Sequence, residues 1–312
     1  MFEETIIKKL PTSVRIIKDA PMRDYTTFQL GGNCPVLIDC PDADALESSA
    51  KLLTKEHLDF IVIGQGSNLL VSDCGIDAIV LRYCSEQSPD VRFDGCCVTV
   101  SGNTLLDDLV RLCVEQGVGD IAFCSGIPGT VGGAIAGNAG AFGKQIGDVV
   151  ESVRLMDLNG TIRDINATEL QFKYRSSILK KTKGIILDAV LKLQPVDIQN
   201  MQDEREELLQ LRRTKHPDWK TMPCAGSVFR NLEPTSAAER RQAAGWFLEE
   251  VGAKDFRVGG AHLFEKHANI IIAGPEATAK DVYQLTEKMI AAVNEKFGFK
   301  LEREIKLIGE FS

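Results

Sequence analysis

Residues 60–71 read FIVIGQGSNLLV, in which a β-branched apolar run leads directly into two closely spaced glycines. Such a run, bounded by a turn signal, predicts a buried strand that ends at Gly64. A second glycine cluster, SGIPGTVGG, occupies residues 125–133 and continues into NAGA at 138–141. Glycine allows positive φ and lets backbone amides approach an anion without a Cβ in the way. Each loop alone is typical of a plain turn, but the pair together predicts that a pyrophosphate is held between them.

Two common nucleotide-binding motifs are absent from the sequence. GQGSNL at residues 64–69 lacks the third glycine of the G-x-G-x-x-G fingerprint, which disfavours a Rossmann dinucleotide site. The chain also has no G-x-x-x-x-G-K-[ST] segment, which disfavours a P-loop kinase or GTPase. The glycine loops therefore form another kind of nucleotide site, or else they form only tight turns.

Around these loops, apolar patterns alternate between strand and helix spacing. Strands are predicted over 35–39, 60–63, 78–82, 96–101, 151–157 and 184–193, with a final strand over 301–309. Helices are predicted over 42–56, 104–117, 197–214, 239–251 and 279–297. The glycine-rich stretch 119–148 interrupts this alternation. The pattern predicts a mixed α and β fold with several short sheets, and a main domain boundary near 195–215.

The charge balance excludes whole classes of function. Lys and Arg number 36 against 44 Asp and Glu, a formal net charge of −8, so the chain lacks the positive charge that nucleic-acid binding requires. No apolar run approaches the roughly 20 residues of a membrane-spanning helix. The N-terminus, MFEETIIKKL, has no signal-peptide pattern. We therefore expect a cytoplasmic protein with neither nucleic acid nor membrane as a partner.

The cysteines and histidines form no recognisable disulfide or metal pattern. The nine cysteines are odd in number, C-x-x-C does not occur, and Cys96 and Cys97 are adjacent. His262 and His267 are five residues apart, which is off the helical i, i+4 spacing of metal ligands. We expect reduced thiols and no metal site.

Further motifs complete an ordered set with the two glycine loops: YTTFQLGG at 25–32, YRSS at 174–177, AGSVF at 225–229 and LEREI at 301–305. In this order, and over nearly the whole chain, the sequence resembles the UDP-N-acetylenolpyruvoylglucosamine reductases (UDP-N-acetylmuramate dehydrogenases) of peptidoglycan precursor synthesis. The ordered set is far more specific than any single loop.

The resemblance implies an α+β fold with an FAD-binding domain of the PCMH, or vanillyl-alcohol-oxidase, type over residues 1–195. This domain would comprise two subdomains, about 1–85 and 86–195. A smaller C-terminal α+β domain over 196–312 would bind the UDP-sugar and return its last strand to the active site. FAD would be bound non-covalently, because no histidine between residues 58 and 215 is available for a covalent link. The YRSS motif runs directly into the next strand, as in the shorter family type without an inserted tyrosine loop.

The resemblance also implies which residues bind FAD, chiefly through backbone amides. These are Gly64, Gln65, Gly66, Ser67, Asn68, Leu69, Ser125, Gly126, Ile127, Pro128, Gly129, Thr130, Gly132, Gly133, Asn138, Gly140 and Ala141. NADPH would be the hydride donor, and the chain is expected to act as a monomer.

Three residues are implied to be catalytic in reducing the enol ether of UDP-N-acetylglucosamine enolpyruvate. Ser227 would donate the proton to the enolate carbon, although a serine beside glycine is common in plain turns. Arg175 would pair with the substrate carboxylate through its planar fork, unless it forms an ordinary surface ion pair. Glu304 would stabilise or protonate the intermediate as an acid, which requires a raised pKa.

The choice of Glu304 over Glu302 follows the family pattern L-E-x-E, whose second glutamate is catalytic. Two residues apart on a predicted strand, both would face the same side. The family often has proline where this chain has Arg303. The resemblance further implies that Lys215 contacts the UDP diphosphate and that Asn231 contacts the substrate. Arg230, where lysine is usual, would contact the diphosphate with altered geometry. Tyr174 would pack near the substrate or the flavin.

Two alternatives stay open at this point. One is another flavin oxidase or dehydrogenase of the same domain type, acting on an alcohol or sugar. The other is a non-catalytic paralogue that binds a flavin or a nucleotide sugar. Retention of Arg175, Ser227 and Glu304 counts against the first, and an intact Ser227 counts against the second.

Overall fold

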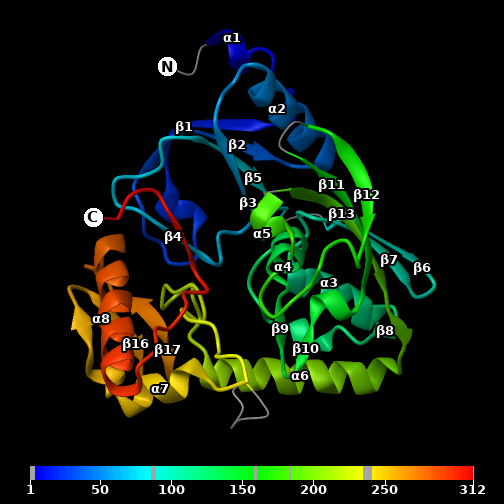
Figure 1. Ribbon diagram of the computed structural model, residues 1–312. Coiled ribbons are helices and arrows are strands. Elements are labelled where there is room, and N and C mark those ends of the chain that lie inside the picture. The colour runs from blue at the N-terminus through cyan, green and yellow to red at the C-terminus, as the bar shows by residue number, and fades with distance from the viewer. Residues whose placement is uncertain (1–3, 86–88, 158–159, 183, 235–240, 312) are drawn as a thin grey trace. The chain divides into compact units, whose positions relative to one another are not determined.

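The computed structural model describes residues 4–85, 89–157, 160–182, 184–234 and 241–311 (Figure 1). Helices and strands are mixed along the chain, which agrees with the predicted α+β class. The residues form two compact units, each assembled from separate stretches. Unit 1 comprises residues 1–19, 35–65 and 78–212, and unit 2 comprises residues 20–34, 66–77 and 213–312. The predicted division into domains 1–195 and 196–312 stays a prediction.

The first sheet has the strand order β1-β2-β5-β3, and its strands β2, β5 and β3 are parallel. Its strands are β1 (Arg15–Pro21), β2 (Asn33–Cys40), β3 (Phe60–Ile63) and β5 (Ile79–Tyr83). Helix α2 (Ala43–Lys55) begins where the Asp42 carboxylate accepts a hydrogen bond from the Ala45 amide at 2.8 Å. Leu46 and Leu53 on α2 pack into the core of this sheet. The strands and helix predicted in this region are confirmed within two residues.

The second sheet of unit 1 is antiparallel, with the order β12-β11-β13-β7-β6. Its strands are β6 (Val91–Asp94), β7 (Cys97–Ser101), β11 (Val150–Met156), β12 (Ile162–Asn166) and β13 (Ile185–Lys192). Helices α3 (Leu106–Glu115) and α4 (Val131–Gly137) contribute Leu109 and Ile135 to the same core as Val98 and Val153. One face of the sheet is therefore apolar and helix-covered, whereas alternate residues point to the other face.

Helix α4 lies in the glycine-rich stretch, where the sequence had predicted no helix. The Thr130 hydroxyl accepts a hydrogen bond from the Gly133 amide at 3.3 Å, which caps the first turn. Asn138 ends the helix in the left-handed region, with φ of 48°. The glycines of this helix have a low helix propensity, so the caps and the buried Val131 and Ile135 decide its formation.

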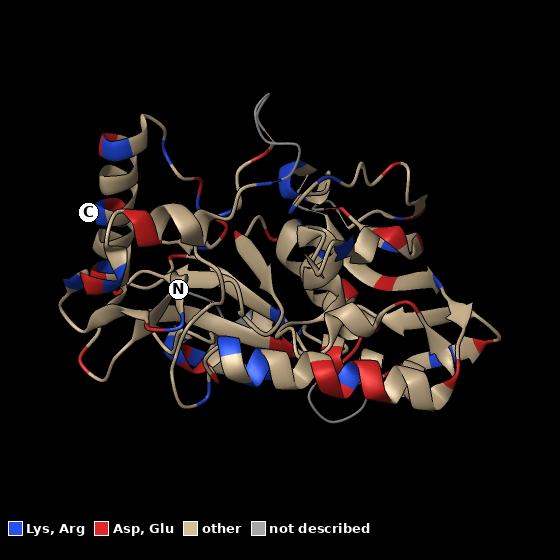
Figure 2. Cartoon of the chain, turned by 90° about the horizontal axis from the view of Figure 1, so that it is seen from below, with Lys and Arg blue, Asp and Glu red and all other residues tan. Residues whose placement is uncertain are grey.

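Short elements complete unit 1. They are α1 (Glu4–Ile7), α5 (Leu179–Thr182), the 3₁₀ turns Ala122–Cys124 and Ile146–Asp148, and the paired short strands β8 (Val118–Gly119) with β14 (Gln194–Pro195) and β9 (Gly140–Ala141) with β10 (Lys144–Gln145). The predicted long polar helix is confirmed as α6 (Ile198–Lys215), which carries both signs of charge along its length (Figure 2). Met201 is its one fully buried residue.

Unit 2 is built around a three-stranded antiparallel sheet with helix α8 (Ala279–Phe297) against it (Figure 1). The strands of this sheet are β15 (Arg257–Val258), β16 (Ala261–Phe264) and β17 (His267–Ala273). The unit also contains the 3₁₀ turns Met22–Tyr25 and Ala253–Asp255, α7 (Ala244–Glu250), and β4 (Leu69–Val71) paired in parallel with β18 (Lys306–Ile308). A capping box of Thr278 and Asp281 starts α8, and Gly298 ends it with φ of 78°.

Two predicted elements in unit 2 are wrong in extent. The helix predicted over 239–251 begins only at Ala244, because Leu232 pairs with Gln242 in an extended bridge; residues 239–240 lie outside the described residues. The final strand predicted over 301–309 is regular only over Lys306–Ile308. Upstream of it, Arg303 makes a single bridge to Phe229. The premise that Glu302 and Glu304 share one face of a regular strand is therefore wrong.

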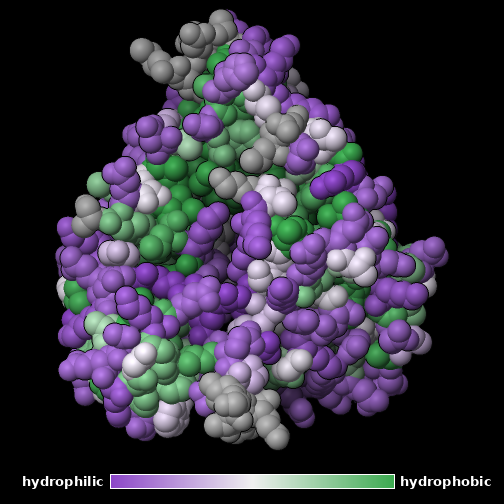
Figure 3. Space-filling view, in the orientation of Figure 1, coloured by the Kyte–Doolittle hydropathy of each residue, from purple (hydrophilic) through white to green (hydrophobic). Residues whose placement is uncertain are grey.

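No described helix is long and apolar enough to span a membrane. Hydrophilic residues predominate on the face drawn in Figure 3. All nine cysteines are free thiols. Among the described residues, no group of three or more His, Cys, Asp or Glu side chains is arranged to hold a metal ion.

Candidate active site

Gly64, at the start of the first glycine loop, approaches the second loop within unit 1. A Cβ on Gly64 would lie 2.4 Å from the Thr130 Oγ1 atom, so only glycine fits the first loop against the second. Gly66 has φ of +69°, and a Cβ there would lie 2.1 Å from the Tyr25 carbonyl oxygen in unit 2. Both positions need glycine because of close approach, and Gly66 needs it also because of its backbone conformation.

The loops present amide groups that no acceptor in the described part of the chain satisfies. Within unit 1 these are the backbone N–H groups of Gly64, Gln65, Gly129 and Thr130. Clustered amides of this kind form an anion-binding concavity, and the phosphates of a dinucleotide cofactor are suitable ligands. The geometry therefore fits the predicted FAD site, in which backbone amides make the main contacts.

Some predicted cofactor residues use their side chains within the loop itself. The Ser125 hydroxyl donates to the Ala122 carbonyl oxygen at 2.6 Å, and Ser125 is fully buried. Asn138 is 1% exposed; its amide nitrogen donates to Gln145 Oε1 and the Lys173 carbonyl oxygen, and its Oδ1 accepts from the Gly147 amide. These two side chains shape the loop, so any cofactor contact at these positions would come from the backbone.

Asp107 fixes the start of the second loop. Its carboxylate accepts from the Gly126 amide at 2.7 Å and from both terminal nitrogens of Arg205 at 2.7 and 2.9 Å. Burial raises the pKa of Asp107, but the hydrogen bonds from Arg205 and Gly126 outweigh it, so the pKa is lowered overall. Gly126 can take part in this arrangement because its φ is +68°.

Arg212 is a candidate residue that sequence analysis missed. Its Cδ atom lies 3.0 Å from where a Gly126 Cβ would be, and its Nε and Nη2 atoms are buried without a hydrogen-bond partner among the described residues. Burial lowers its pKa, opposed by Cys124 and Asp107 and reinforced by the nearby charge of Arg175. Such a guanidinium suits an anionic ligand group. The available signal was spacing, because Arg205 and Arg212 are seven residues apart on one face of α6.

Arg175 occupies a tight turn between Lys173 and Ser176, whose backbone groups exchange hydrogen bonds at 2.9 and 3.0 Å. Its φ of 52° is uncommon for a side chain of this size and costs about 1 kcal/mol or more. Three side-chain contacts hold the turn. Asn138 donates to the Lys173 carbonyl oxygen at 2.9 Å, the Ser177 hydroxyl donates to the Ala136 carbonyl oxygen at 2.8 Å, and Lys180 Nζ donates to the Arg175 carbonyl oxygen at 2.6 Å. The half-buried Tyr174 ring lies 5.5 Å from the Arg175 guanidinium.

Ser227 and Glu304 lie on neighbouring segments of unit 2. Ser227 is half-buried and bridges Ile270 on β17, directly after Gly226 with φ of +66°. The next residue, Val228, accepts the Glu304 amide at 2.7 Å through its carbonyl oxygen. The predicted proton donor and the predicted acid are thus brought together by backbone pairing.

Asn269 and Asn68 hold these two segments from either side. The buried Asn269 side chain accepts from the Phe229 amide at 2.9 Å and donates to the Phe229 carbonyl oxygen at 2.8 Å. The Asn68 side chain donates to the Glu304 carbonyl oxygen at 3.1 Å, and the Asn68 backbone carbonyl oxygen accepts a hydrogen bond from the Lys306 amide at 2.9 Å. Asn68, predicted as a cofactor residue, therefore also positions the candidate catalytic segment.

The two glutamates of the LEREI motif have different surroundings. The exposed Glu302 carboxylate pairs with Arg230 at 2.8 Å, whereas Glu304 is half-buried. Arg230, predicted to contact the substrate diphosphate, is thus engaged by an acid of its own chain. This pairing distinguishes Glu302 from Glu304, which the predicted strand register could not do.

Lys215 and Asn231, the other predicted substrate residues, are exposed. The Asn231 side-chain oxygen accepts a hydrogen bond from the amide of Ala244, the first residue of α7, at 3.1 Å.

Two histidines also lie close together in unit 2, where the His216 ring is 5.6 Å from the His267 ring. Burial lowers the pKa of His267, and the positive charges of Lys254 and Lys215 act in the same direction, while a backbone hydrogen bond and Glu249 oppose them.

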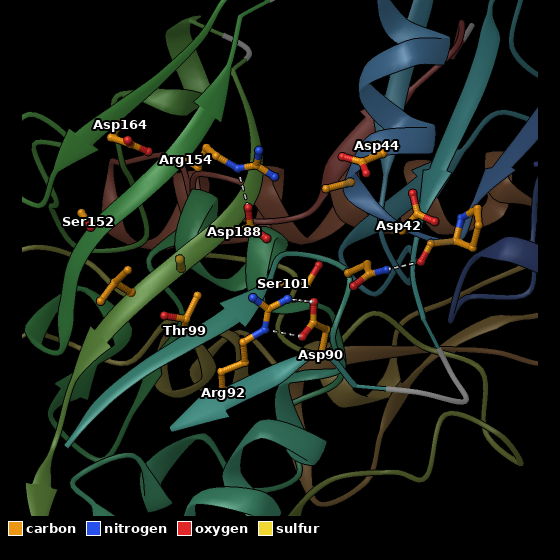
Figure 4. A pocket seen from close by; sticks show the side chains of 15 residues that line it. Asp42, Asp44, Asp90, Arg92, Thr99, Ser101, Ser152, Arg154, Asp164 and Asp188 are labelled. Atoms are coloured by element: carbon orange, nitrogen blue, oxygen red, sulfur yellow. Dashed lines mark hydrogen bonds and ion pairs between the residues drawn. The ribbon is translucent and has the colours of Figure 1, made fainter. Parts of the chain in front are cut away.

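A separate cavity of about 600 Å³ lies on the polar face of the second sheet in unit 1 (Figure 4). Carboxylates and two arginines line it, and Arg154 pairs with Asp188 at 2.5 Å. None of the predicted site residues lines this cavity. It is therefore distinct from the candidate active site.

Two family models match the chain. Residues 35–166 match the model described as "FAD binding domain", and residues 216–308 match "UDP-N-acetylenolpyruvoylglucosamine reductase, C-terminal domain". The first match places the chain among proteins with an FAD-binding domain, which confirms the predicted fold class and cofactor.

Curated relatives match over almost their full length. The UDP-N-acetylenolpyruvoylglucosamine reductase of Alkaliphilus oremlandii is 36% identical over 307 residues, 98% of this chain and 97% of the relative. The Clostridioides difficile enzyme of the same name is 36% identical over 296 residues, 94% and 93% of the two chains. A crystal structure of UDP-N-acetylenolpyruvylglucosamine reductase from Thermus caldophilus has a TM-score of 0.76 and 30% identity, covering 95% of this chain and 99% of that one. The chain belongs to the UDP-N-acetylenolpyruvoylglucosamine reductase family.

Proposed function

We propose that the protein reduces UDP-N-acetylglucosamine enolpyruvate to UDP-N-acetylmuramate, with NADPH as hydride donor and bound FAD as carrier, in peptidoglycan precursor synthesis. The observation that carries the proposal is the backbone pairing that sets Ser227 beside the Glu304 segment, through the 2.7 Å bond from the Glu304 amide to Val228. These are the two residues that a proton transfer to the substrate needs in one place. Family membership supports the same reaction.

The cofactor would be held in unit 1 by the unsatisfied amides of Gly64, Gln65, Gly129 and Thr130, with Arg212 beneath the second loop. Bound FAD supplies the hydride chemistry that no side chain of this protein can provide. The protein's own contribution is to bind the ligands, orient them and move one proton.

The reduction adds one hydride and one proton across the enol double bond. Hydride addition at the terminal vinyl carbon places negative charge on the neighbouring carbon and its carboxylate. Arg175 would bind that carboxylate through two parallel N–H donors and keep its charge as the enolate forms. Ser227 would deliver the proton to the enolate carbon, and Glu304 would stabilise the same centre as an acid.

The nucleotide part of the substrate would be bound by Lys215 and Asn231, with Tyr174 packing near it. Lys215 is a better diphosphate ligand than Arg230, because its ammonium is exposed while the Arg230 guanidinium already pairs with Glu302. We further propose that the enzyme works as a monomer in the cytoplasm, where its free thiols stay reduced.

The test is NADPH oxidation by the purified protein, with and without UDP-N-acetylglucosamine enolpyruvate, after its visible spectrum is recorded. A flavin spectrum and substrate-dependent oxidation are expected. A flavin spectrum without substrate-dependent oxidation would reject the reductase and favour the alcohol or sugar oxidase. A protein that cannot be reconstituted with FAD would overturn the assignment of both glycine loops.

A further inference from the structure

Glu304 lies in an irregular segment that has few backbone restraints of its own. Residues 301–305 form no regular strand. Their main chain is held by the Arg303–Phe229 bridge, with bonds from the Arg230 amide to the Glu302 carbonyl oxygen and from the Glu304 amide to the Val228 carbonyl oxygen. The Ile305 amide also donates to Val228, and the Asn68 side chain donates to the Glu304 carbonyl oxygen. A side chain on such a segment can keep one position only if neighbouring side chains anchor it.

Arg303 provides that anchor on helix α8. Its Nε atom donates to the Thr286 hydroxyl at 2.8 Å, its Nη2 atom pairs with the Glu287 carboxylate, and its guanidinium lies 5.1 Å from the Tyr283 ring centroid. These three partners are spaced i, i+3 and i+4, so they form one continuous patch on the helix surface. The Arg303 side chain is 20% exposed, which indicates a packed contact rather than a free surface charge.

The anchoring surface is itself rigid. Helix α8 is capped at both ends and buries Val282, Leu285, Met289 and Val293 in the core of unit 2. Thr286 is fully buried, and its hydroxyl also donates to the Tyr283 carbonyl oxygen at 2.6 Å. Arg303 therefore ties the Glu304 segment to the most firmly packed helix of this unit.

The residue before Arg303 is also restrained, because the Glu302 carboxylate pairs with Arg230. Glu302 is thus held by Arg230, and Arg303 is held on α8. We propose that Arg303 is a positioning residue, which sets the Glu304 carboxyl at the reacting carbon by anchoring its segment on α8. This inference rests on the role of Glu304 in the proposed function.

The effect of Arg303 is one of geometry rather than charge. Its positive charge is balanced by Glu287, so it adds little net field at Glu304. Proton transfer and transition-state stabilisation need hydrogen-bond reach, and a misplacement of about 1 Å can cost about 100-fold in rate. Losing the anchor is thus expected to slow the step that uses Glu304 and to leave other steps unchanged.

The test measures the two half-reactions of the FAD-loaded enzyme separately by stopped-flow spectroscopy. Arg303→Ala should slow reoxidation of the reduced flavin by the enolpyruvyl substrate about 10- to 100-fold, with flavin reduction by NADPH unchanged. Arg303→Lys, which keeps the charge but loses the fork, should recover only part of the rate. In a Glu304→Gln background, Arg303→Ala should cause no further loss, because both changes act through one residue.

Lys296→Ala is the matched control. Lys296 is also on α8, and the change removes its ion pair with Glu250 at the end of α7, so both half-reactions should stay unchanged. If Arg303→Ala does not fold, Glu287→Gln weakens the same anchor at an exposed position and should give a smaller loss of the same kind. Losses that add in the double variant, or a full rate in Arg303→Ala, would overturn the inference. A full rate in Glu304→Gln would instead reject the proposed role of Glu304.

Discussion

The turn that carries Arg175 and the segment that carries Glu304 hold their candidate catalytic side chains in different ways. Arg175 is in a closed two-residue turn with a strained φ of 52°. The Asn138 side chain donates to the Lys173 carbonyl oxygen of this turn, and the Ser177 hydroxyl donates to the Ala136 carbonyl oxygen. Glu304 is in an irregular segment that backbone bonds hold against Val228 and that Arg303 holds against α8. Contacts distant in sequence hold both regions, but the Arg175 turn also has a strained backbone conformation.

This difference predicts how the geometry of each region should respond when the contacts that hold it are substituted. A strained turn loses its geometry when the polar groups that hold it are removed, because the backbone can relax to an ordinary conformation. A segment pinned by several weak contacts loses precision gradually, one contact at a time. Substitutions should therefore separate the two regions by which half-reaction and which constant they alter.

The largest effect is expected for Ser227→Ala. Removing the proton donor should slow substrate-dependent reoxidation of the flavin by about 10²- to 10⁴-fold. Flavin reduction by NADPH should stay nearly intact, since no proton from Ser227 is needed there. Stopped-flow measurement of the two half-reactions decides this, and two fast half-reactions would show that Ser227 is only a turn residue.

A second comparison separates the two glutamates of the LEREI motif. Glu304→Gln should slow the same half-reaction about 10²-fold. Glu302→Gln should stay within about twofold of wild type and lose at most about 1 kcal/mol of stability, because it breaks only an exposed ion pair with Arg230. Equal losses in the two variants would contradict the distinction that the Arg230 contact draws between them.

Asn138→Ala tests the strained turn. The change removes a buried hydrogen bond to the Lys173 carbonyl oxygen and should cost about 1–3 kcal/mol of unfolding free energy. It should also raise KM for the enolpyruvyl substrate, because Arg175 loses its position. Gln145→Ala removes another partner of Asn138 but leaves the Lys173 contact, so it serves as the control. A substrate KM that rises equally in both variants would speak against the link between Asn138 and Arg175.

The smallest effect concerns the pH dependence of stability through Asp107. Its folded-state pKa is lowered, so its contribution is fully present above its unfolded pKa of about 3.9 and is lost as pH falls through the folded pKa. The difference in Tm between wild type and Asp107→Asn should therefore be constant above about pH 5 and shrink in more acidic buffer. Asp108→Asn is the control, because Asp108 forms only a 3.5 Å surface ion pair with Arg111. A Tm difference that stays unchanged at low pH would contradict the lowered pKa.

Local sequence pattern predicted most of the regular elements because each has its own signal. The run FIVI before Gly64 became β3, and Asp42 capped α2 where the pattern placed a helix start. Helix α4 was missed because its glycines mask the capping signals of Thr130 and Asn138. The strand predicted over 301–309 was too long because the alternating pattern does not reveal that residues 301–305 make a single backbone bridge and side-chain contacts instead of a regular ladder.

The sequence alone determined the class of the molecule: an acidic α+β chain with two glycine loops suited to a pyrophosphate and an ordered set of family motifs. Glycine spacing and motif order are local properties, so they can be read without coordinates. Only the tertiary structure brought Arg212 beneath Gly126, paired Glu302 with Arg230 and anchored Arg303 on α8. Each of these contacts joins residues distant in the chain, and such pairings depend on how the whole unit packs rather than on the residues beside them.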